Sequence, residues 1–454
     1  MKNHFSKQEP KIDVAVIGGG PAGMMAAGRA AESGAKVILI EKNNFLGRKL
    51  LLTGKGRCNL AQAEFDKRKF IGEFGKNGQF LYPALLAFGV EDVINFFEER
   101  GLKTKTERGG RVFPASDRSM DVLNVLIKYL TNAKVKIISN AEVIDLQCEN
   151  NNIKGIEPFD ICARSEEQKR ACSSIARLII KSLVLKNQKI TANSYIICAG
   201  GKSYPQTGST GDGYKWAQKL GHAIIPPRPA LVPIKIREKW VKDCQGLSLK
   251  NVQINVVQGG KNQDSRFGEM LFTHFGVSGP IILDISKKVG ELLASGKVIL
   301  SLDLKPALNL AQLDQRLQKD FRKYQNKNFK NSLNDLLPRK IIPAIIMLSK
   351  INPDKPVNKI SRQERCVLVN LLKNINLTVE GLTGFDQAII TTGGVDLREI
   401  DPRTMKSKLI DNLFFAGEII NLDGPSGGYN LQICWSTGHL AGESAAKFYY
   451  TGIS

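Results

Sequence analysis

Residues 12–23 read IDVAVIGGGPAG, and this stretch decides the fold. Its first six residues form an apolar run that predicts a short buried strand, and the glycines predict a tight turn. The alanine-rich segment that follows suits a helix packed closely on a sheet, and AKVILIEK predicts a second strand. A strand, a turn, a helix and a strand within about 30 residues predict the opening of a parallel α/β sheet.

The glycines of this turn predict a dinucleotide-binding site. Gly18, Gly20 and Gly23 fit the pattern GxGxxG directly between the strand and the helix. The first glycine permits the tight turn, the second admits a pyrophosphate to the backbone, and the third lets the helix pack on the strand. Glu41 ends the second strand 18 residues after Gly23, where a carboxylate can accept hydrogen bonds from both ribose hydroxyls. Because that carboxylate would repel a 2′-phosphate, we do not expect NADP in this site.

A second glycine-rich region near the C-terminus favours FAD over NAD. Residues 413–418, LFFAGE, predict a buried strand that ends in Gly-Glu, and residues 424–446 predict a glycine turn that leads into a helix of small residues. Two such regions suit a long cofactor, whereas an NAD site needs only the first. The alternative interpretation is a strand and a helix that merely complete the sheet.

Composition limits the class of protein. The chain has 454 residues, which suggests two or three domains, and no apolar run long enough to predict a membrane span. The N-terminus lacks the apolar core of a signal peptide, and eight scattered cysteines suggest a reduced, cytoplasmic protein. Four histidines without short spacings predict no metal site.

The pattern along the chain predicts an interrupted α/β domain. We expect its first part at residues 10–205 and its second part at 391–454. Between them, short strands with glycine turns predict a β-barrel-like insert at 206–304, to which residues 374–390 return. Residues 305–373 predict a basic helical insert, including a helix after the N-cap Ser361. Residues 158–177 interrupt the strand pattern and are interpreted as a surface loop or short helix.

The net charge of +22 admits two interpretations. Residues 303–373 hold 15 Lys and Arg against 6 Asp and Glu, which suits either an RNA-binding surface or a generally basic surface. No basic arm with interleaved aromatic residues and no zinc finger is present in the sequence. We therefore do not expect nucleic acid as the main partner, and keep RNA or tRNA binding as the alternative.

Six motifs, in order, carry a resemblance to a known family. They are GGGPAG, GRKLLLTGKGRCNL, AGGKSYPQTGSTGDGY, LFTHFGVSGP, TTGGV and LFFAGEIINLDGPSGGYNLQ. Over nearly its whole length the chain resembles the bacterial NAD(P)/FAD-dependent oxidoreductases that include aminoacetone oxidase and bile-acid-reductase-like flavoproteins. The resemblance implies a Rossmann-type, glutathione-reductase-like FAD domain, interrupted by a β-barrel-like insert that carries a helical sub-domain.

The resemblance also implies cofactor-binding residues at matching motif positions. The pyrophosphate and adenosine side is assigned to Gly18, Gly20, Ala22, Gly23, Glu41, Lys42 and the backbone of Val143. The loop 47–60 is assigned through Arg48, Lys49, Gly56, Arg57, Cys58 and Asn59. The ribityl and flavin side is assigned to Gly417, Glu418, Gly428, Tyr429, Asn430 and Leu431.

Three further features are interpreted from their residues alone, without the resemblance. Gly200 and Gly201 end a predicted strand, and we expect them to pass near the flavin, because AGGKSYPQTGSTGDGY lacks the context of a phosphate-binding Walker loop. His274 and Tyr429 are candidate acid–base residues, although a single histidine is more often structural. Cys58 suggests thiol–disulfide chemistry, but it has no partner cysteine within thirty residues.

These observations predict an FAD-dependent oxidoreductase that transfers hydride or electrons between flavin and a small organic substrate. The sequence leaves open whether NADH, NADPH or neither reduces the flavin, because no second GxGxxG is visible. The alternative is a flavoprotein that binds or modifies RNA through its basic helical insert. The sequence leaves the substrate and the oligomeric state open.

Overall fold

The computed structural model describes residues 12–151 and 177–451, and the chain divides into two compact units. The first unit contains the chain up to residue 228 and from residue 390 onward, and the second unit is Pro229–Ile389. Each unit has a hydrophobic core of its own. The loop or short helix expected at 158–177 lies outside the described residues, except that Arg177 begins β8 (Arg177–Leu185).

The first unit reaches residue 228, whereas the sequence placed the domain boundary after residue 205. The added segment contains α7 (Asp212–Lys219) and most of β11 (Ile224–Ala230). α7 packs on this unit, because a Cβ on Gly213 would lie 2.6 Å from Ile419 Cδ1. β11 pairs with β18 (Ile390–Val395), the strand on which the chain returns from the second unit.

The first unit is built on a parallel sheet with the strand order β19-β10-β1-β2-β6. These strands are β19 (Leu413–Phe415), β10 (Ala192–Ile197), β1 (Ile12–Ile17), β2 (Val37–Ile40) and β6 (Lys136–Ile138). β1 is almost wholly buried, as its continuous apolar run predicts for a central parallel strand. Two smaller antiparallel sheets complete the unit: β3 (Ala61–Gln62), β5 (Arg111–Pro114) and β4 (Thr104–Glu107), and β7 (Val143–Asn151), β8 and β9 (Lys189–Ile190).

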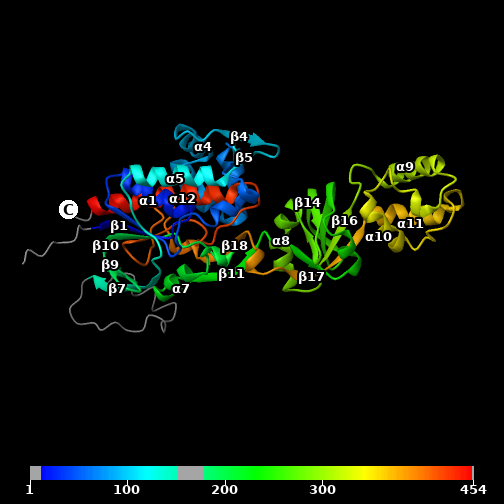
Figure 1. The fold of residues 1–454 in the computed structure, drawn as a ribbon. Coiled ribbons are helices and arrows are strands. Elements are labelled where there is room, and N and C mark those ends of the chain that lie inside the picture. Colours follow the sequence, from blue (N-terminus) through cyan, green and yellow to red (C-terminus); the bar gives the residue numbers. More distant parts are fainter. Residues whose placement is uncertain (1–11, 152–176, 452–454) are drawn as a thin grey trace, which may run out of the picture. The chain divides into compact units, whose positions relative to one another are not determined.

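Helices α1 (Pro21–Glu32), α5 (Ser119–Asn132) and α12 (Tyr429–Thr451) lie together on one face of the parallel sheet (Figure 1). α1 and α12 approach closely through small residues: a Cβ on Gly438 would lie 2.5 Å from the carbonyl oxygen of Ala22. The helix that begins at the first glycine turn is therefore packed against the last helix of the chain.

One stretch of the first unit, Gly75–Glu99, is long and apolar enough to cross a membrane by length and composition, and 50% of its most apolar window is buried. It is broken into a short 3-10 turn, α3 (Gly78–Ala87) and α4 (Val90–Glu99), with the chain turning at Phe88 and Gly89. α2 (Lys67–Gly72) packs on α3, and α3 in turn packs on α12. The apolar side chains of this stretch thus contribute to the core of the first unit.

The second unit contains a closed antiparallel barrel with the strand order β12-β15-β14-β13-β16-β17. Its strands are β12 (Ile234–Ile236), β15 (Gly276–Ser278), β14 (Lys261–Phe272), β13 (Ser248–Gln258), β16 (Ile299–Asp303) and β17 (Ile375–Leu382). The sequence predicted only strands here, but α8 (Pro280–Leu293) packs on the barrel. Ile281, Ile285 and Val289 recur every four residues on its buried side, a helical period that the short-strand interpretation overlooked.

Three helices, α9 (Leu310–Lys323), α10 (Ile342–Ser349) and α11 (Arg362–Lys373), are inserted between β16 and β17. Leu313, Phe321 and Leu368 belong to the same hydrophobic cluster as the barrel interior, so the helices extend the barrel core. α11 begins at the predicted cap, where the Glu364 N–H donates to Ser361 Oγ at 3.2 Å. The expected class, a Rossmann-type domain interrupted by a barrel with inserted helices, is confirmed.

Candidate cofactor site

The first glycine turn joins β1 to α1 and leaves the N-terminus of α1 open. Gly20 is the N-cap residue, so no side chain caps the free N–H groups. No atom of the described residues lies within 4 Å of the place that a Cβ on Gly20 would occupy. At Gly23 a Cβ would instead collide with the carbonyl oxygen of Gly18. The turn is therefore tightly packed on the side of Gly23 and open on the side of Gly20, where it presents backbone N–H donors. This arrangement is the one that binds a pyrophosphate.

Glu41, at the end of β2, lies beside this turn. Its buried carboxylate accepts a hydrogen bond from the Gly19 N–H at 2.7 Å. The other oxygen accepts from the backbone N–H and the side-chain amide of Asn43, at 2.8 and 2.6 Å. The carbonyl oxygen of Glu41 accepts a hydrogen bond from the Ala141 N–H at 2.9 Å. The predicted residue Val143 lies two positions further along the chain from this contact. The sequence did not predict Asn43, the residue that orients Glu41.

The second glycine turn, after β19, meets the first. A Cβ on Gly417 would lie 2.7 Å from the Cβ of Ala22, and the Gly417 N–H donates to Thr437 Oγ1 at 3.0 Å. Gly417 has a φ of 79°, a left-handed conformation that favours glycine. The two regions predicted to share one cofactor are 394 residues apart in the chain, from Gly23 to Gly417, yet they lie in contact.

Glu418 is the centre of a polar network at this contact. Lys49 Nζ lies 2.6 Å from Glu418 Oε2, and both side chains are about four-fifths buried, at 20% and 17% exposed. The Ser203 hydroxyl donates to Glu418 Oε1 at 2.7 Å, as does the Thr391 N–H at 2.7 Å. Ser203 and Thr391 were not predicted individually, although both lie in motifs that carried the resemblance. The hydroxyl groups in those motifs were the sequence signal that could have identified these two residues.

The other predicted cations also have partners within the first unit. Lys42 donates to Thr210 Oγ1 and Asp212 Oδ2, at 2.6 and 2.9 Å. Burial alone would raise the pKa of Asp212, but the hydrogen bonds from Lys42 and Thr210 hold it below its ordinary value. Arg48 donates to Asn43 Oδ1 at 2.9 Å. These contacts fix the shape of the site, while the contacts of Lys42 with the adenosine ribose and of Arg48 with the cofactor stay predictions.

Arg57 is held in place by three neighbours. It forms ion pairs with Glu107 at 2.8 Å and with Asp117 at 3.2 Å. Its guanidinium lies 3.9 Å from the centre of the Phe113 ring. The hydrogen bond that Arg57 donates to Glu107 is the largest cause that raises the pKa of Arg57. Arg57 thus ties the loop 47–60 to the β4–β5 hairpin.

Cys58 and Asn59 differ in chemistry. Cys58 is fully buried, and burial raises the pKa of its thiol to about 12, so it carries no thiolate near neutral pH. The side-chain oxygen of Asn59 is buried without a hydrogen-bond partner among the described residues. An unpaired buried acceptor costs about 1–3 kcal/mol, which a ligand N–H would offset. In the part of the chain that the structure describes, nothing lies within 4 Å of a Cβ on Gly56, so the loop leaves room there.

The remaining predicted glycines lie around Glu418 and the start of α12. A Cβ on Gly201 would lie 3.0 Å from Glu418 Oε1, and one on Gly200 would lie 3.0 Å from Ser209 Oγ. Gly428 packs on the strand that follows Asn59, because its Cβ would lie 2.8 Å from the Gln62 nitrogen. The three groups of predicted cofactor-binding residues therefore all lie in the first unit. These groups are the pyrophosphate and adenosine side, the loop 47–60, and the ribityl and flavin side.

The predicted residues of the α12 N-terminus serve different contacts. The Tyr429 ring lies 4.9 Å from that of Phe70, centre to centre. The side-chain amide of Asn430 folds back and donates to the carbonyl of Gly424 at 2.9 Å. Leu431 packs on the hydrophobic core of the first unit. His274 belongs to the second unit, where it is exposed and its ring stands edge-on to Phe275 at 4.8 Å.

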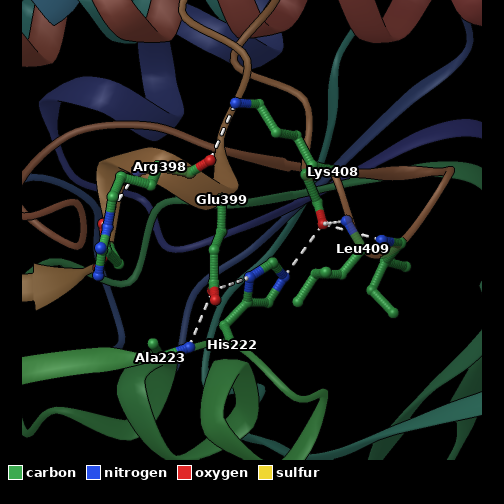
Figure 2. A network of polar contacts seen from close by, with 9 residues as sticks. His222, Ala223, Arg398, Glu399, Lys408 and Leu409 are labelled. Carbon is green, nitrogen blue, oxygen red and sulfur yellow. Dashed lines mark hydrogen bonds and ion pairs between the residues drawn. The ribbon is translucent and has the colours of Figure 1, made fainter. Parts of the chain in front are cut away.

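A second polar cluster has the composition of a nucleophilic triad but not its accessibility (Figure 2). His222 Nδ1 lies 3.2 Å from Glu399 Oε2, and His222 Nε2 lies 3.0 Å from Ser407 Oγ. Ser407 Oγ already accepts from the N–H groups of Leu409 and Ile410, at 3.0 and 2.9 Å. His222 and Ser407 are 2% and 3% exposed, so no acyl substrate reaches the hydroxyl.

This cluster is instead a structural clamp. Burial alone would raise the pKa of Glu399, but hydrogen bonds from His222 and from the Ala223 N–H hold it below its ordinary value. The Lys408 ammonium donates to the carbonyl of Arg398 at 2.9 Å and closes the same loop. The clamp joins the chain after α7 to the chain before β19, and so supports the strand that leads to Gly417.

The donor set of the first unit fits FAD. It offers the uncapped N-terminus of α1, a buried carboxylate for a ribose, and the side-chain oxygen of Asn59, which is buried without a partner among the described residues. A dinucleotide that binds only the first turn would make no use of the second turn, which the contact between Ala22 and Gly417 joins to the first. A Rossmann-type sheet with these two joined turns defines a flavoprotein of the FAD-binding class.

The chain belongs to the HI0933-like family. Residues 12–174 match the HI0933-like protein Rossmann domain, and residues 228–390 match the HI0933-like protein barrel and H2TH domain. The chain is 31% identical, over 96% of its length and 99% of the relative's, to a 3-dehydro-bile acid delta(4,6)-reductase of Clostridium scindens. It is 27% identical, over 94% and 96%, to a ribosomal RNA dihydrouridine synthase of Escherichia coli.

Solved structures agree with the fold. A 3-ketosteroid-delta4-(5alpha)-dehydrogenase from Rhodococcus jostii RHA1 superposes with a TM-score of 0.50 at 15% identity, over 98% of each chain. With its family established, the protein is an FAD-dependent oxidoreductase, as the sequence predicted.

Proposed function

We propose that this protein reduces a carbon–carbon double bond conjugated to a carbonyl group. One relative is named for reducing the 4,6 double bonds of a 3-dehydro bile acid, which are conjugated to the 3-oxo group. The other is named for forming dihydrouridine, in which the uracil double bond next to a carbonyl has been reduced. Both substrates present a polarised double bond whose β-carbon accepts hydride. That shared chemistry, in two relatives aligned over nearly the whole chain, carries the proposal.

The residues of the first unit are assigned to cofactor binding on chemical grounds. We assign the turn Gly18–Gly23 to the pyrophosphate and Glu41 to the adenosine ribose. Gly417 and Glu418 are assigned to the ribityl side, and the backbone N–H groups of residues 428–431 to negative charge on the flavin. FAD held by these residues and reduced by NADH or NADPH would supply the hydride for the β-carbon, with the nicotinamide as the proposed source of that hydride.

The reduction also needs one proton at the α-carbon. Tyr429 and His274 are the proposed donors, because a phenol and an imidazole can both deliver a proton near neutral pH. The balance is one hydride and one proton added to the double bond, with the nicotinamide oxidised. Tyr429→Phe and His274→Gln separate the two: the true donor's loss lowers the rate of substrate reduction without slowing reduction of the flavin by nicotinamide.

A small organic enone is the first candidate substrate, and a uracil base in RNA is the second. The second is favoured by one specific observation, the concentration of cations in residues 303–373. A bile acid carries a single anionic group and needs few cations, whereas RNA carries one phosphate at each nucleotide.

The test is anaerobic turnover with NADH and NADPH, a steroid 4-en-3-one, and a uridine-rich RNA, with products identified by mass spectrometry. A gain of two hydrogens in either acceptor supports the proposal. Flavin that is reduced by nicotinamide but passes its electrons to neither acceptor would remove it and leave the FAD assignment intact.

A further inference from the structure

The second unit contains an open groove of about 840 Å³ on its helical part. Residues from the 3-10 turns before α10, from α10 itself and from the loop after it line the groove. None of the twelve lining residues is acidic. Its polar members are three cations and three amides: Lys330, Arg339, Lys350, Asn331, Asn334 and Asn352.

The charges of residues 303–373 divide cleanly into paired and unpaired groups. Each of the six acids forms an ion pair with a different cation: Asp303–Lys373, Asp314–Arg365, Asp320–Arg316, Asp335–Lys323, Asp354–Lys330 and Glu364–Lys355. Nine cations of this segment, all within the described part of the chain, are left without an acidic partner: Lys305, Lys319, Arg322, Lys327, Arg339, Lys340, Lys350, Lys359 and Arg362.

Two of these unpaired cations, Arg339 and Lys350, lie on the groove, and both are exposed. The third groove cation, Lys330, is held by Asp354 at 2.7 Å and remains 48% exposed. Surface ion pairs are worth about 0–1 kcal/mol, so this pairing costs little to open. The groove therefore offers two free cations and a third that can exchange its partner.

The floor and rim of the groove suit nucleobases. The apolar lining of the groove, here called its floor, includes Ile342, Ile346 and Met347, and Met347 is 56% exposed. Apolar and polarisable side chains of this kind can contact the face of an unstacked base. The side-chain oxygens of Asn331 and Asn334 accept no hydrogen bond within the described residues, and amides at a rim can read the edges of bases.

We propose that this groove docks a single-stranded or looped segment of RNA. Arg339 and Lys350 bind backbone phosphates, and the apolar floor takes a base from the strand. The choice of RNA rests on the second substrate candidate above, and the docking is measured without any turnover. The closing experiment therefore fails or succeeds separately from the reductase proposal.

The test uses the flavin-loaded full chain and a fluorescent RNA stem-loop with a uridine-rich loop, with binding followed by anisotropy over a range of salt. Arg339→Gln/Lys350→Gln removes two groove cations. Lys319→Gln/Arg322→Gln, on α9, removes two cations that are equally exposed and unpaired but lie outside the groove. Met347→Glu places a negative charge in the floor at an exposed position.

We expect the groove variant to lose about tenfold or more in affinity, and the slope of log affinity against log salt to fall by about 1.4, two phosphates' worth for a single strand. Met347→Glu weakens binding similarly, and the α9 variant by about twofold or less. Flavin content and melting temperature stay the same in all three. Equal losses in the groove and α9 variants, or binding of a polyglutamate peptide in preference to RNA, would overturn the proposal. RNA binding without reduction of any conjugated double bond would leave the docking standing and remove the proposed function.

Discussion

In the first unit, two cations near the glycine turns are held by acids of the same unit, Lys42 by Asp212 and Lys49 by Glu418. In the helical part of the second unit, nine of the fifteen cations have no acidic partner among the described residues, and eight of these nine are exposed. The same residue types therefore do two different things. Paired cations fix loops around a site that binds through backbone N–H groups, and unpaired cations leave a surface charged for an external anion.

The same difference bears on loop 47–60, whose assignment to the cofactor stays a prediction. The loop holds four cations in fourteen residues. Two of them, Arg57 and Lys49, neutralise acids that come from distant parts of the chain. The sequence shows where cations are, while their partners depend on long-range packing.

The largest effect is expected from closing the gap between the two glycine turns. Gly417→Ala adds a Cβ at 2.7 Å from that of Ala22, at a φ of 79°. Strain of about 1–3 kcal/mol at such a position should lower flavin occupancy at limiting FAD about tenfold. Gly72→Ala is the matched control, since none of the described residues has an atom within 4 Å of the added Cβ. Flavin absorbance per protein measures both, and equal occupancy would contradict the joined-turn site.

A second comparison tests paired against unpaired cations directly. Lys49→Met leaves the largely buried Glu418 without its cation, which should cost about 1–3 kcal/mol in the free energy of unfolding. Lys319→Met removes an exposed, unpaired cation of the second unit and should change that free energy by about 0.5 kcal/mol or less. Urea unfolding of the two variants measures the difference. The added change Glu418→Gln should recover part of the loss in the first variant and would not do so if the pair contributed nothing.

A pH effect should arise from the core of the first unit. His439 stacks on Phe88 at 4.5 Å, and burial, with the nearby Arg29 charge, lowers its pKa to about 4 from the ordinary 6.5. Because the unfolded chain then binds a proton that the folded chain excludes, stability is lost as pH falls from 6.5 toward 4. His439→Phe removes this contribution. Melting curves should show a shallower acid dependence in the variant, and parallel curves would show that His439 is not the cause.

The smallest effect is expected at Cys58. Its buried thiol, with a pKa raised to about 12, cannot act as a thiolate near neutral pH. Cys58→Ala should retain flavin and change turnover by about twofold or less, given that buried substitutions of this size cost about 1 kcal/mol. Steady-state turnover with NADH or NADPH checks this. Loss of turnover with the flavin still bound would restore a redox role for the thiol.

Much of the fold was predictable because it depends on local patterns. The strand and glycine turn at residues 12–23, the return of the chain at residues 390–395 and the cap at Ser361 all follow from neighbouring residues. α8 was missed because glycine turns on both sides suggested strands, although Ile281, Ile285 and Val289 have a helical period. The domain boundary was placed early because nothing local shows that α7 packs on Ile419.

The site was predictable in its glycines and less so in its polar partners. Gly18, Gly23 and Gly417 are identifiable because the conformation and close approach that they permit have few substitutes. Ser203 and Thr391 were not, because a hydroxyl group that completes a network looks like any other in the sequence. The clamp of His222, Glu399 and Ser407 spans 185 residues and has no sequence signature at all.

The most direct test of the central claim is a single-turnover reaction of the photoreduced, anaerobic protein. The reduced flavin is mixed rapidly with a steroid 4-en-3-one, with uridine-rich RNA, or with the matching saturated 3-ketone, and the return of the oxidised flavin absorption is followed. The account predicts prompt reoxidation by at least one conjugated acceptor and none by the saturated ketone. Reoxidation at the same rate by the saturated ketone, or by no conjugated acceptor, would contradict it.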